Sequence, residues 1–330
     1  MTDKTTLNWG ILATGGIATN MAQALNFIPQ ANLVAVASRS IDRAQQFADR
    51  WNIPYAYGSY EELVANPDID VVYIGTPHPA HMDNILMSLN AGKHVLCEKP
   101  LTLNAAQAER CIAAAKANDR FLMEAVWMRF IPAIVKLRQL IAEGAIGDIL
   151  MIHAHINMAL SSNPRDRVLN PVLGGGALLD VGIYPLNFTT MLLGFPESYD
   201  AHVRLGETGV DTQETMLLRY PDGVAALLSA GVTADLPNDA VIKGSKGYIV
   251  VHEEFWNPRK LTVKQQNAEP DVIHLPYDST GLNYEAVAVC EDIFAGRHDN
   301  AIMPLETTLK LLQMMDDLRG RWGVTYPMEA

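Results

Sequence analysis

The sequence predicts an α/β protein in two parts: a doubly wound parallel sheet, then an α+β part with a large open, mostly antiparallel sheet. In the first 125 residues, short β-rich apolar runs alternate with helical patterns, which is typical of βαβ units. A glycine-containing turn over residues 10–18 follows the first of these runs. Beyond residue 125, strand patterns follow one another with little helix between them, which indicates antiparallel pairing.

The elements of the first part are separated by turn residues. Gly92, for example, follows the helical pattern of 81–90 and predicts the left-handed residue at which a helix ends. The pattern changes after residue 125, where we place a domain boundary. The predicted strands cover 7–13, 33–37, 70–75, 93–97 and 121–124, and the predicted helices cover 17–27, 41–51, 81–90 and 104–117.

The second part is dominated by strand patterns. One face of an open sheet needs a cover, and pairing with a second subunit is a common solution. We therefore expect a homodimer, or a higher homo-oligomer, formed through this sheet. The predicted strands cover 148–158, 201–204, 214–219, 225–231, 240–243, 248–252 and 261–264, with helices over 132–142, 284–294 and 305–322.

Composition narrows the class of protein. The chain has 330 residues, 49% of them apolar, enough for two cores, and a net charge of −12, which disfavours nucleic-acid binding. Its apolar runs are too short or too interrupted to span a membrane, and Met1–Lys4 does not resemble a secretion signal, so we expect a cytoplasmic protein. The three widely spaced cysteines fit neither a disulfide framework nor a metal pattern, and we expect them to be reduced and mostly buried.

The turn over 10–18 matches a dinucleotide-binding fingerprint with one departure. Gly15 occupies the second glycine position, where pyrophosphate approaches the backbone, and Ala18 occupies the third. Ala13 stands at the first position, which is tolerable if its φ stays negative. A tight turn without a ligand is the alternative, although the repeated βα pattern favours a cofactor. Three further loop residues are expected to line it: Thr14, Gly16 and Ile17.

The end of the second strand predicts NADP in preference to NAD. An NAD enzyme usually carries an acid here for the ribose hydroxyls, and this sequence has none. Arg39 and Arg43 can instead pair with a 2′-phosphate, and Ser38 can hydrogen-bond to it. The alternative is that the two arginines are ordinary surface residues.

Glu98-Lys99-Pro100-Leu101 places a lysine at the carboxyl end of a parallel strand, where open α/β sheets bind their ligands. Together with the segments 76–81 and 92–97, it resembles the Gfo/Idh/MocA family, and this resemblance spans nearly the whole chain. Segments 123–132 and 174–185 are similar to the branch with dimeric dihydrodiol dehydrogenases and NADP-dependent D-xylose dehydrogenases. Many relatives in the wider family carry histidine at the position of Tyr184.

The resemblance implies a dinucleotide-binding Rossmann domain over 1–125 and a substrate-binding and dimerisation domain over 126–330, with nicotinamide and substrate meeting between them. It assigns Lys99 and Tyr184 to catalysis and Asp180 to the substrate pocket. Oxidising an alcohol removes a hydroxyl proton as hydride leaves the carbon, and an ammonium beside a phenol favours the phenolate that accepts this proton. Alternatively, Tyr184 packs against the glycine-rich turn, or Asp180 caps a helix.

The remaining candidates are expected to border the cofactor. Glu98 holds the loop on the nicotinamide side, whereas His81 either caps its helix or contacts a phosphate. The branch resemblance makes Trp127 and Arg129 walls of the cleft, although a tryptophan at a domain junction is often plain core. Thr76 and Pro77 lie where the loop after a strand meets the cofactor.

We therefore expect an NADP-dependent oxidoreductase acting on a secondary alcohol or hemiacetal of a polyhydroxylated substrate. An aldose such as D-xylose fits the branch, and a trans-dihydrodiol is the next candidate. Some relatives of this fold bind the dinucleotide without turnover and act as regulators, but retention of both Lys99 and Tyr184 favours an enzyme. No catalytic metal is expected, because neither histidine pair (78 and 81, or 153 and 155) has a third ligand at suitable spacing. Three segments are expected to distinguish substrates: 161–173, 235–238 and 277–283.

Overall fold

The computed structural model describes residues 5–329, so the interpretation of Met1–Lys4 lies outside the described residues. The chain forms two compact units. The first comprises Met1–Trp127 and Asp278–Gln313, and the second comprises Met128–Tyr277 and Met314–Ala330. The division expected from the sequence, 1–125 and 126–330, differs in that it leaves the segment from Asp278 to Gln313 with the second part.

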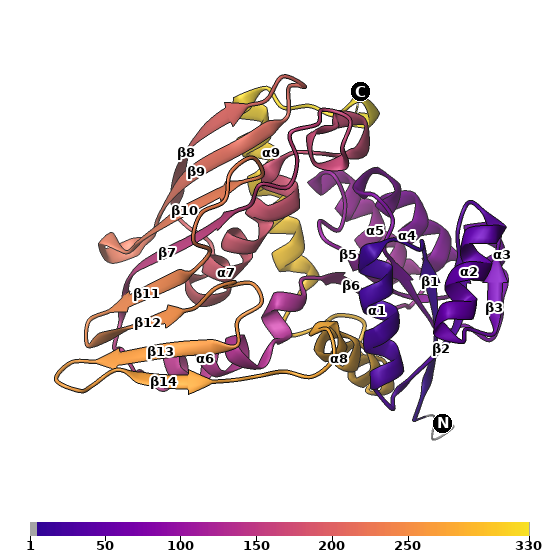
Figure 1. Ribbon diagram of the computed structural model, residues 1–330, viewed down its shortest axis with the longest axis horizontal. Coiled ribbons are helices and arrows are strands. Elements are labelled where there is room, and N and C mark those ends of the chain that lie inside the picture. Colours follow the sequence, from indigo (N-terminus) through magenta and orange to yellow (C-terminus); the bar gives the residue numbers. More distant parts are fainter. Residues whose placement is uncertain (1–4, 330) are drawn as a thin grey trace. The chain divides into compact units, whose positions relative to one another are not determined.

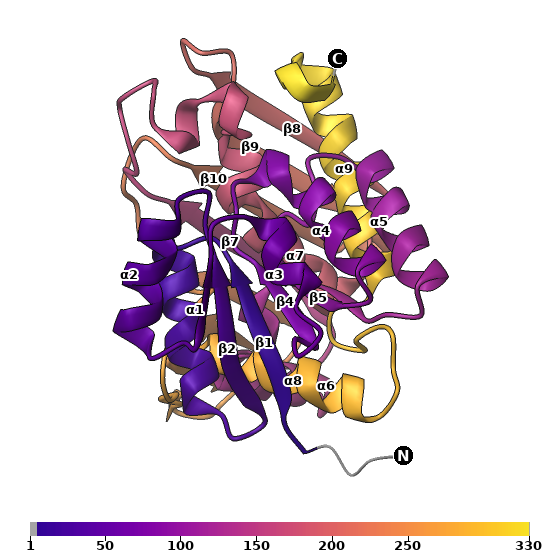
Figure 2. The ribbon, with the colours of Figure 1, turned by 90° about the vertical axis from the view of Figure 1, so that its right-hand side faces the viewer.

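The first unit contains a six-stranded parallel sheet in the order β3-β2-β1-β4-β5-β6. Figure 2 shows β2, β1, β4 and β5 side by side in this sheet. The strand order reverses between β1 and β4, and ligands of such sheets bind at this point, beyond the carboxyl ends of the strands. The strands are β1 (Leu7–Leu12), β2 (Ala31–Ala37), β3 (Tyr55–Tyr57), β4 (Val71–Ile74), β5 (His94–Glu98) and β6 (Leu122–Ala125).

Helices cover the parallel sheet, because its central strands are apolar on both faces. The helix α1 packs against α8, and α4 packs against α3 and α5. The helices are α1 (Gly16–Phe27), α2 (Ile41–Trp51), α3 (Tyr60–Ala65), α4 (His81–Asn90), α5 (Ala105–Ala117) and α8 (Leu282–Phe294). Both β3 and α3 are absent from the sequence prediction, since three and six residues are too short to show a periodic pattern.

The second unit contains an eight-stranded sheet in the order β14-β13-β12-β11-β7-β10-β9-β8, antiparallel except where β10 pairs with β7. Figure 1 shows the strands of this sheet one beside another, from β14 to β8. The strands are β7 (Ile149–Asn157), β8 (Ser198–Leu205), β9 (Asp211–Arg219), β10 (Ala225–Gly231), β11 (Ala240–Gly244), β12 (Gly247–Val251), β13 (Lys260–Gln265) and β14 (Asp271–His274).

Helices of the second unit pack on this sheet. The helix α7 (Ile183–Leu193) contacts β7 and β10, and α6 (Pro132–Ala142) contacts β13. The longest helix, α9 (Leu305–Trp322), begins in the first unit and ends in the second. A π-helical turn, Leu178–Gly182, leads directly into α7.

The sequence prediction missed α7 because the helix is buried on all sides. Every residue from Ile183 to Thr190 is buried, so there is no polar face to give a helical period. The segment Pro171–Leu193 is in fact long and apolar enough to cross a membrane by length and composition, with a mean hydropathy of 1.2, contrary to the expectation from the sequence. Its most apolar window is 83% buried within the protein, as in the core helix of a folded domain.

Candidate active site

In the turn after β1, Gly15 stands where a cofactor would approach the backbone, whereas Ala13 stands where the backbone conformation favours glycine. Ala13 has a φ of 93°, so the condition under which alanine would be tolerable at this position, a negative φ, is not met. Its backbone N–H donates to the Ala37 carbonyl at 2.9 Å, which links the turn to the end of β2. A side chain at this φ is strained, since its Cβ crowds the backbone.

The strain at Ala13 gives a stability prediction. Replacing Ala13 by glycine is expected to raise the free energy of unfolding by about 1 kcal/mol, because glycine adopts positive φ without strain. Ala18 provides the matched control: it lies inside α1, so Ala18→Gly should lower the stability by about 1 kcal/mol or more. Urea unfolding measures both effects. Destabilisation by both substitutions would contradict the assignment of strain to Ala13.

Gly15 and Gly16 present bare backbone at the start of α1. Gly15 is the N-cap with a φ of −79°, which any residue can adopt, and both glycines are exposed. An added Cβ at either position would meet no atom within 4 Å. The fold of this unit therefore does not require glycine at Gly15. The N-terminus of a helix is a favourable place for a phosphate, and absence of a side chain allows close approach.

Basic side chains lie beyond the end of β2. Ser38 is buried, whereas Arg39 and Arg43 are exposed. Arg39 is close enough to Tyr60 for its charge to oppose the rise that burial causes in the Tyr60 pKa. Arg43 and Arg50 both line a hollow of about 500 Å³, whose described lining contains no acidic residue. The other residues around it are Thr14, Thr19, Gln46 and Phe47.

Lys99 follows the last residue of β5 and is partly exposed, and its peptide bond to Pro100 is cis. The neighbouring Glu98 is buried and accepts a hydrogen bond of 2.5 Å from the Tyr73 hydroxyl. Burial raises the pKa of Glu98, while the Tyr73 hydrogen bond and the charge of Lys99 oppose the rise. Tyr73 is a site neighbour that sequence reasoning missed, because an aromatic residue within an apolar strand looks like ordinary core.

The loops around Lys99 are held by buried polar groups. The two ring nitrogens of His81 face the carbonyl oxygens of Thr76 and Pro100, at 2.7 and 2.9 Å, so the histidine connects the loops after β4 and β5. The ring is fully buried, which lowers its pKa, although the two hydrogen bonds oppose this. His81 thus fixes the loop rather than presenting itself to a ligand. The hydroxyl of Thr76 accepts from Asn84 at 3.0 Å, and Pro77 is exposed.

Glu124 is a second residue that sequence reasoning missed. One carboxylate oxygen accepts from the Leu101 backbone N–H at 2.9 Å, and the other accepts from the Thr308 hydroxyl at 2.8 Å. The carboxylate thereby ties the loop after Lys99 to α9. Its signal was present in the sequence, since an acid within a buried strand must have partners.

In the second unit, Tyr184 and Asp180 lie one helical turn apart on a continuous helical segment. Asp180 belongs to the π turn and Tyr184 to the first turn of α7. Tyr184 is 8% exposed, and its ring centroid lies 6.2 Å from that of Trp256. Single-turn π segments occur frequently at functional sites.

Arg167 binds Asp180 and was also missed from the sequence. One guanidinium nitrogen of Arg167 lies 3.0 and 2.9 Å from the two carboxylate oxygens of Asp180. Arg167 belongs to the segment 161–173, which we expected to distinguish substrates. Asp180 is 7% exposed in its side chain and Arg167 is 42% exposed, so the arginine faces solvent and the acid faces the interior. No sequence spacing signals this pair, because the partners are 13 positions apart and are joined by short helical turns and loops with no regular period.

Arg129 and Trp127 lie on either side of the division between the two units. Arg129 is 4% exposed and donates to the side-chain and backbone oxygens of Asn187, at 3.0 and 3.4 Å, on α7. Trp127 is partly exposed and opens a short 3-10 helix, Trp127–Phe130. Among residues 5–329, no group of three or more His, Cys, Asp or Glu is arranged to hold a metal ion.

Comparison with known proteins gives the family. Residues 7–126 match the model of the GFO_IDH_MocA oxidoreductase family with an NAD-binding Rossmann fold, and residues 134–250 match the GFO/IDH/MocA C-terminal domain. The chain belongs to the Gfo/Idh/MocA family. It is therefore a nicotinamide-dependent oxidoreductase, with the two-part architecture expected from its sequence.

Relatives within the Gfo/Idh/MocA family match over nearly full length. The trans-1,2-dihydrobenzene-1,2-diol dehydrogenase of Xenopus tropicalis is 41% identical, over 97% of this chain and 99% of the relative. The human protein of the same name is 39% identical, over 98% and 99%. Among solved structures, the 3-ketoreductase KijD10 from Actinomadura kijaniata, in complex with NADP and TDP-benzene, has a TM-score of 0.86 at 28% identity, covering 96% of this chain and 97% of the other. An aldose-aldose oxidoreductase from Caulobacter crescentus has a TM-score of 0.86 at 25% identity, with coverage of 97% and 98%.

Proposed function

We propose that this member of the Gfo/Idh/MocA family is an NADP-dependent dehydrogenase that transfers hydride between nicotinamide and a CH–OH carbon of a trans-dihydrodiol or an aldose such as D-xylose. The observation that carries the proposal is full-length similarity, near 40% identity, to proteins named as dihydrodiol dehydrogenases. Structural similarity to an aldose-aldose oxidoreductase supports the aldose as an alternative substrate.

The preference for NADP is supported by the charges beyond β2. Arg39 is exposed at the end of this strand, and Arg43 lines a hollow with a second arginine and without an acid among its described lining. A 2′-phosphate would find charge-assisted hydrogen bonds there, whereas an NAD ribose would find no carboxylate. The relative from Actinomadura kijaniata was solved with NADP.

For catalysis, we propose that Tyr184 exchanges the hydroxyl proton of the substrate and that the ammonium of Lys99 stabilises negative charge on the reacting oxygen. The bound cofactor supplies or accepts the hydride. The chain's own residues hold these two groups: the Glu98 region and the buried His81 fix the loop of Lys99, and α7 fixes Tyr184. Asp180 is proposed to orient the substrate, and its charge is balanced by Arg167.

A substrate screen tests the function. The protein would be mixed with NADP or NAD and with trans-1,2-dihydrobenzene-1,2-diol, D-xylose or other aldoses and polyols, and the absorbance at 340 nm would be followed. We expect NADPH to form with one of these substrate classes. A protein that binds NADP in a thermal-shift assay but turns over none of them would refute the proposed substrates and favour a regulatory role.

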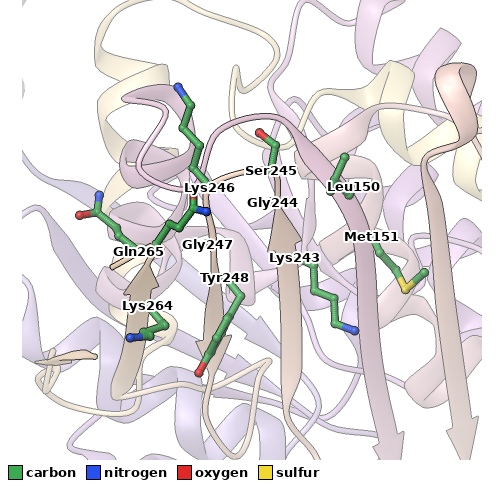
Figure 3. A pocket seen from close by; sticks show the side chains of 11 residues that line it. Leu150, Met151, Lys243, Gly244, Ser245, Lys246, Gly247, Tyr248, Lys264 and Gln265 are labelled. Carbon is green, nitrogen blue, oxygen red and sulfur yellow. The ribbon is translucent and has the colours of Figure 1, made fainter. Parts of the chain in front are cut away.

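We also propose that the exposed face of the eight-stranded sheet pairs with a second copy of the chain. Side chains from four neighbouring strands, β7, β11, β12 and β13, meet around a pocket of about 630 Å³ on this sheet (Figure 3). The register brings Lys243 opposite both Met151 and Tyr248. Tyr248 is 39% exposed, and Leu227 on β10 is 38% exposed, so apolar and basic groups alternate on this face.

Sedimentation velocity tests the proposed dimer. The wild-type protein is expected to sediment as a dimer at about 10 µM, and Tyr248→Asp combined with Leu227→Asp should shift it to the monomer, because the two charges would be desolvated in the interface. A monomeric wild-type protein would end this proposal.

The three cysteines are buried and form no disulfide, which supports the reducing cytoplasm that we propose as the location.

A further inference from the structure

Two buried acids lie beneath the π turn of the second unit. Asp211 and Glu214, both on β9, have exposures of 0% and 1%. Among residues 5–329, neither oxygen of the Glu214 carboxyl has a hydrogen-bond partner, and one oxygen of Asp211 has none. Buried polar groups nearly always have partners, so these exceptions call for a reason.

Glu214 lies directly against the backbone of Gly182, the last residue of the π turn. A Cβ atom at Gly182 would stand 2.5 Å from a carboxyl oxygen of Glu214, closer than real Cβ contacts. The φ and ψ of Gly182 are −61° and −25°, an ordinary helical conformation that any residue adopts. Nothing in the backbone therefore demands glycine at this position. It is the close approach of the Glu214 carboxyl that requires glycine at Gly182, two residues before Tyr184.

Asp211 holds the other end of the same turn. Its carboxylate accepts from the Leu178 backbone N–H at 2.6 Å. Its second oxygen occupies the space that a Cβ of Gly176 would need, and this glycine has a φ of +126°. The Tyr326 hydroxyl donates to the Gly175 carbonyl at 2.7 Å beside it. Side chains from β9 thus contact both ends of the π turn, and Tyr326 from the C-terminal segment holds the glycine-rich loop before it.

Two further segments, α9 and the C-terminal segment that follows it, place side chains near the two acids. Arg319 on α9 has its guanidinium carbon 4.9 Å from the centroid of the Tyr326 ring. Burial raises the Asp211 pKa, and the charge of Arg319 opposes this rise. Burial raises the pKa of Tyr326, and the charges of Asp211 and Glu214 raise it further. The neighbouring strands β8 and β10 place Val203 and Ala230 opposite Glu214, and neither residue can titrate. Neither neighbouring strand, β8 or β10, therefore places a basic group opposite Glu214.

Burial raises the pKa of Glu214 well above its ordinary value of 4.5, and the charge of Asp211 raises it further. On the π turn itself, Asp180 is already paired with Arg167. A carboxylate at Glu214 would lie against the backbone of Gly182 with no donor to accept from. The neutral acid is the form that this position accommodates.

We propose that Glu214, as the uncharged acid, is a positioning residue that fixes the π turn and through it the side chains of Asp180 and Tyr184. The inference rests on the proposed function, because it assigns catalysis to Tyr184. Deprotonation places a charge beneath Gly182, and the turn must move to bring a donor or water to it. A displacement of about 1 Å at a reacting group is enough to reduce turnover by about 100-fold.

Kinetics with NADP and trans-1,2-dihydrobenzene-1,2-diol test this over about pH 6 to pH 10. Glu214→Ala is expected to lower kcat by about 10- to 100-fold while leaving the KM for NADP within about two-fold, since the phosphate-binding turn belongs to the other unit. Glu214→Gln, which keeps the shape and cannot ionise, should retain kcat and lose the alkaline decline that Glu214 causes in the wild type. Met216→Ala is the matched control: this residue is buried on the same strand, so its loss should lower stability but not kcat.

Stability gives an independent reading that needs no substrate. Because the pKa of Glu214 is higher in the folded protein than in the unfolded chain, its contribution is full below about pH 4.5 and is lost as the pH rises through the folded pKa. The free energy of unfolding of Glu214→Gln should therefore fall less with pH than that of the wild type. Equal pH profiles for wild type and Glu214→Gln, or a kcat of Glu214→Ala equal to that of Met216→Ala, would overturn the inference. If Glu214→Ala does not fold, the glutamine comparison decides alone. Failure of Tyr184→Phe to reduce kcat would instead overturn the proposed function.

Discussion

Replacing Lys99 by methionine is expected to lower kcat by about 10²- to 10⁴-fold, because the substitution keeps the length of the side chain and removes its charge. Tyr184→Phe is expected to have an effect of the same order, since it removes only the hydroxyl that exchanges the proton. Stopped-flow and steady-state absorbance at 340 nm measure both. The dissociation constant of NADP should change little in either variant.

Two exposed positions supply the controls for these variants. Lys116→Met, on α5, and Tyr55→Phe, on β3, make the same chemical changes away from the proposed catalytic groups. Both controls should retain wild-type kcat. If Lys99→Met turns over as fast as Lys116→Met, then Lys99 has no part in the reaction. If the double variant Lys99→Met/Tyr184→Phe is slower than the wild type by the full product of the two single effects, the two groups act independently, which would contradict a shared transition state.

Removing the basic groups beyond β2 is expected to abolish the preference for NADP. Each charge-assisted hydrogen bond to a phosphate contributes about 1.5–3 kcal/mol, so Arg39→Ala and Arg43→Ala should each raise the KM for NADP by about 10-fold or more. The KM for NAD should stay within about two-fold, because NAD lacks the 2′-phosphate. Arg110→Ala, at an exposed arginine on α5, is the control and should change neither value. A wild-type enzyme that prefers NAD, or variants with unchanged cofactor preference, would refute the proposal.

Much of the fold could be predicted because its signals are local. The helix at 41–51 and the strand at 225–231 were predicted with the bounds that they have in the structure. Each is delimited by turn residues and has a pattern of apolar residues that depends on its own sequence. The buried helix α7 and the short β3 carry no such pattern. Their structure is decided by packing against strands that lie far away in the sequence.

The candidate site was predictable to the extent that its chemistry resides in motifs. Gly15 and Lys99 follow strands of a recognisable βαβ series, so their place at the edge of the parallel sheet follows from the order of elements. The partners of the supporting groups could not be found in this way. Arg167, Tyr73 and Glu124 act through partners that are 13, 25 and 23 residues distant, and only folding brings each pair together.

By itself, the sequence determined the class of fold and the family, because alternation of elements and short motifs are local properties of the chain. The residues that we propose to hold a dinucleotide or to move a proton lie in the same motifs. Only the tertiary structure decided the strained φ of Ala13, the fixing of His81 between two loops and the contact of Glu214 with Gly182. These depend on which backbone atoms approach one another across the fold. The energy of such contacts arises from distance and burial, and neither is encoded in any single segment.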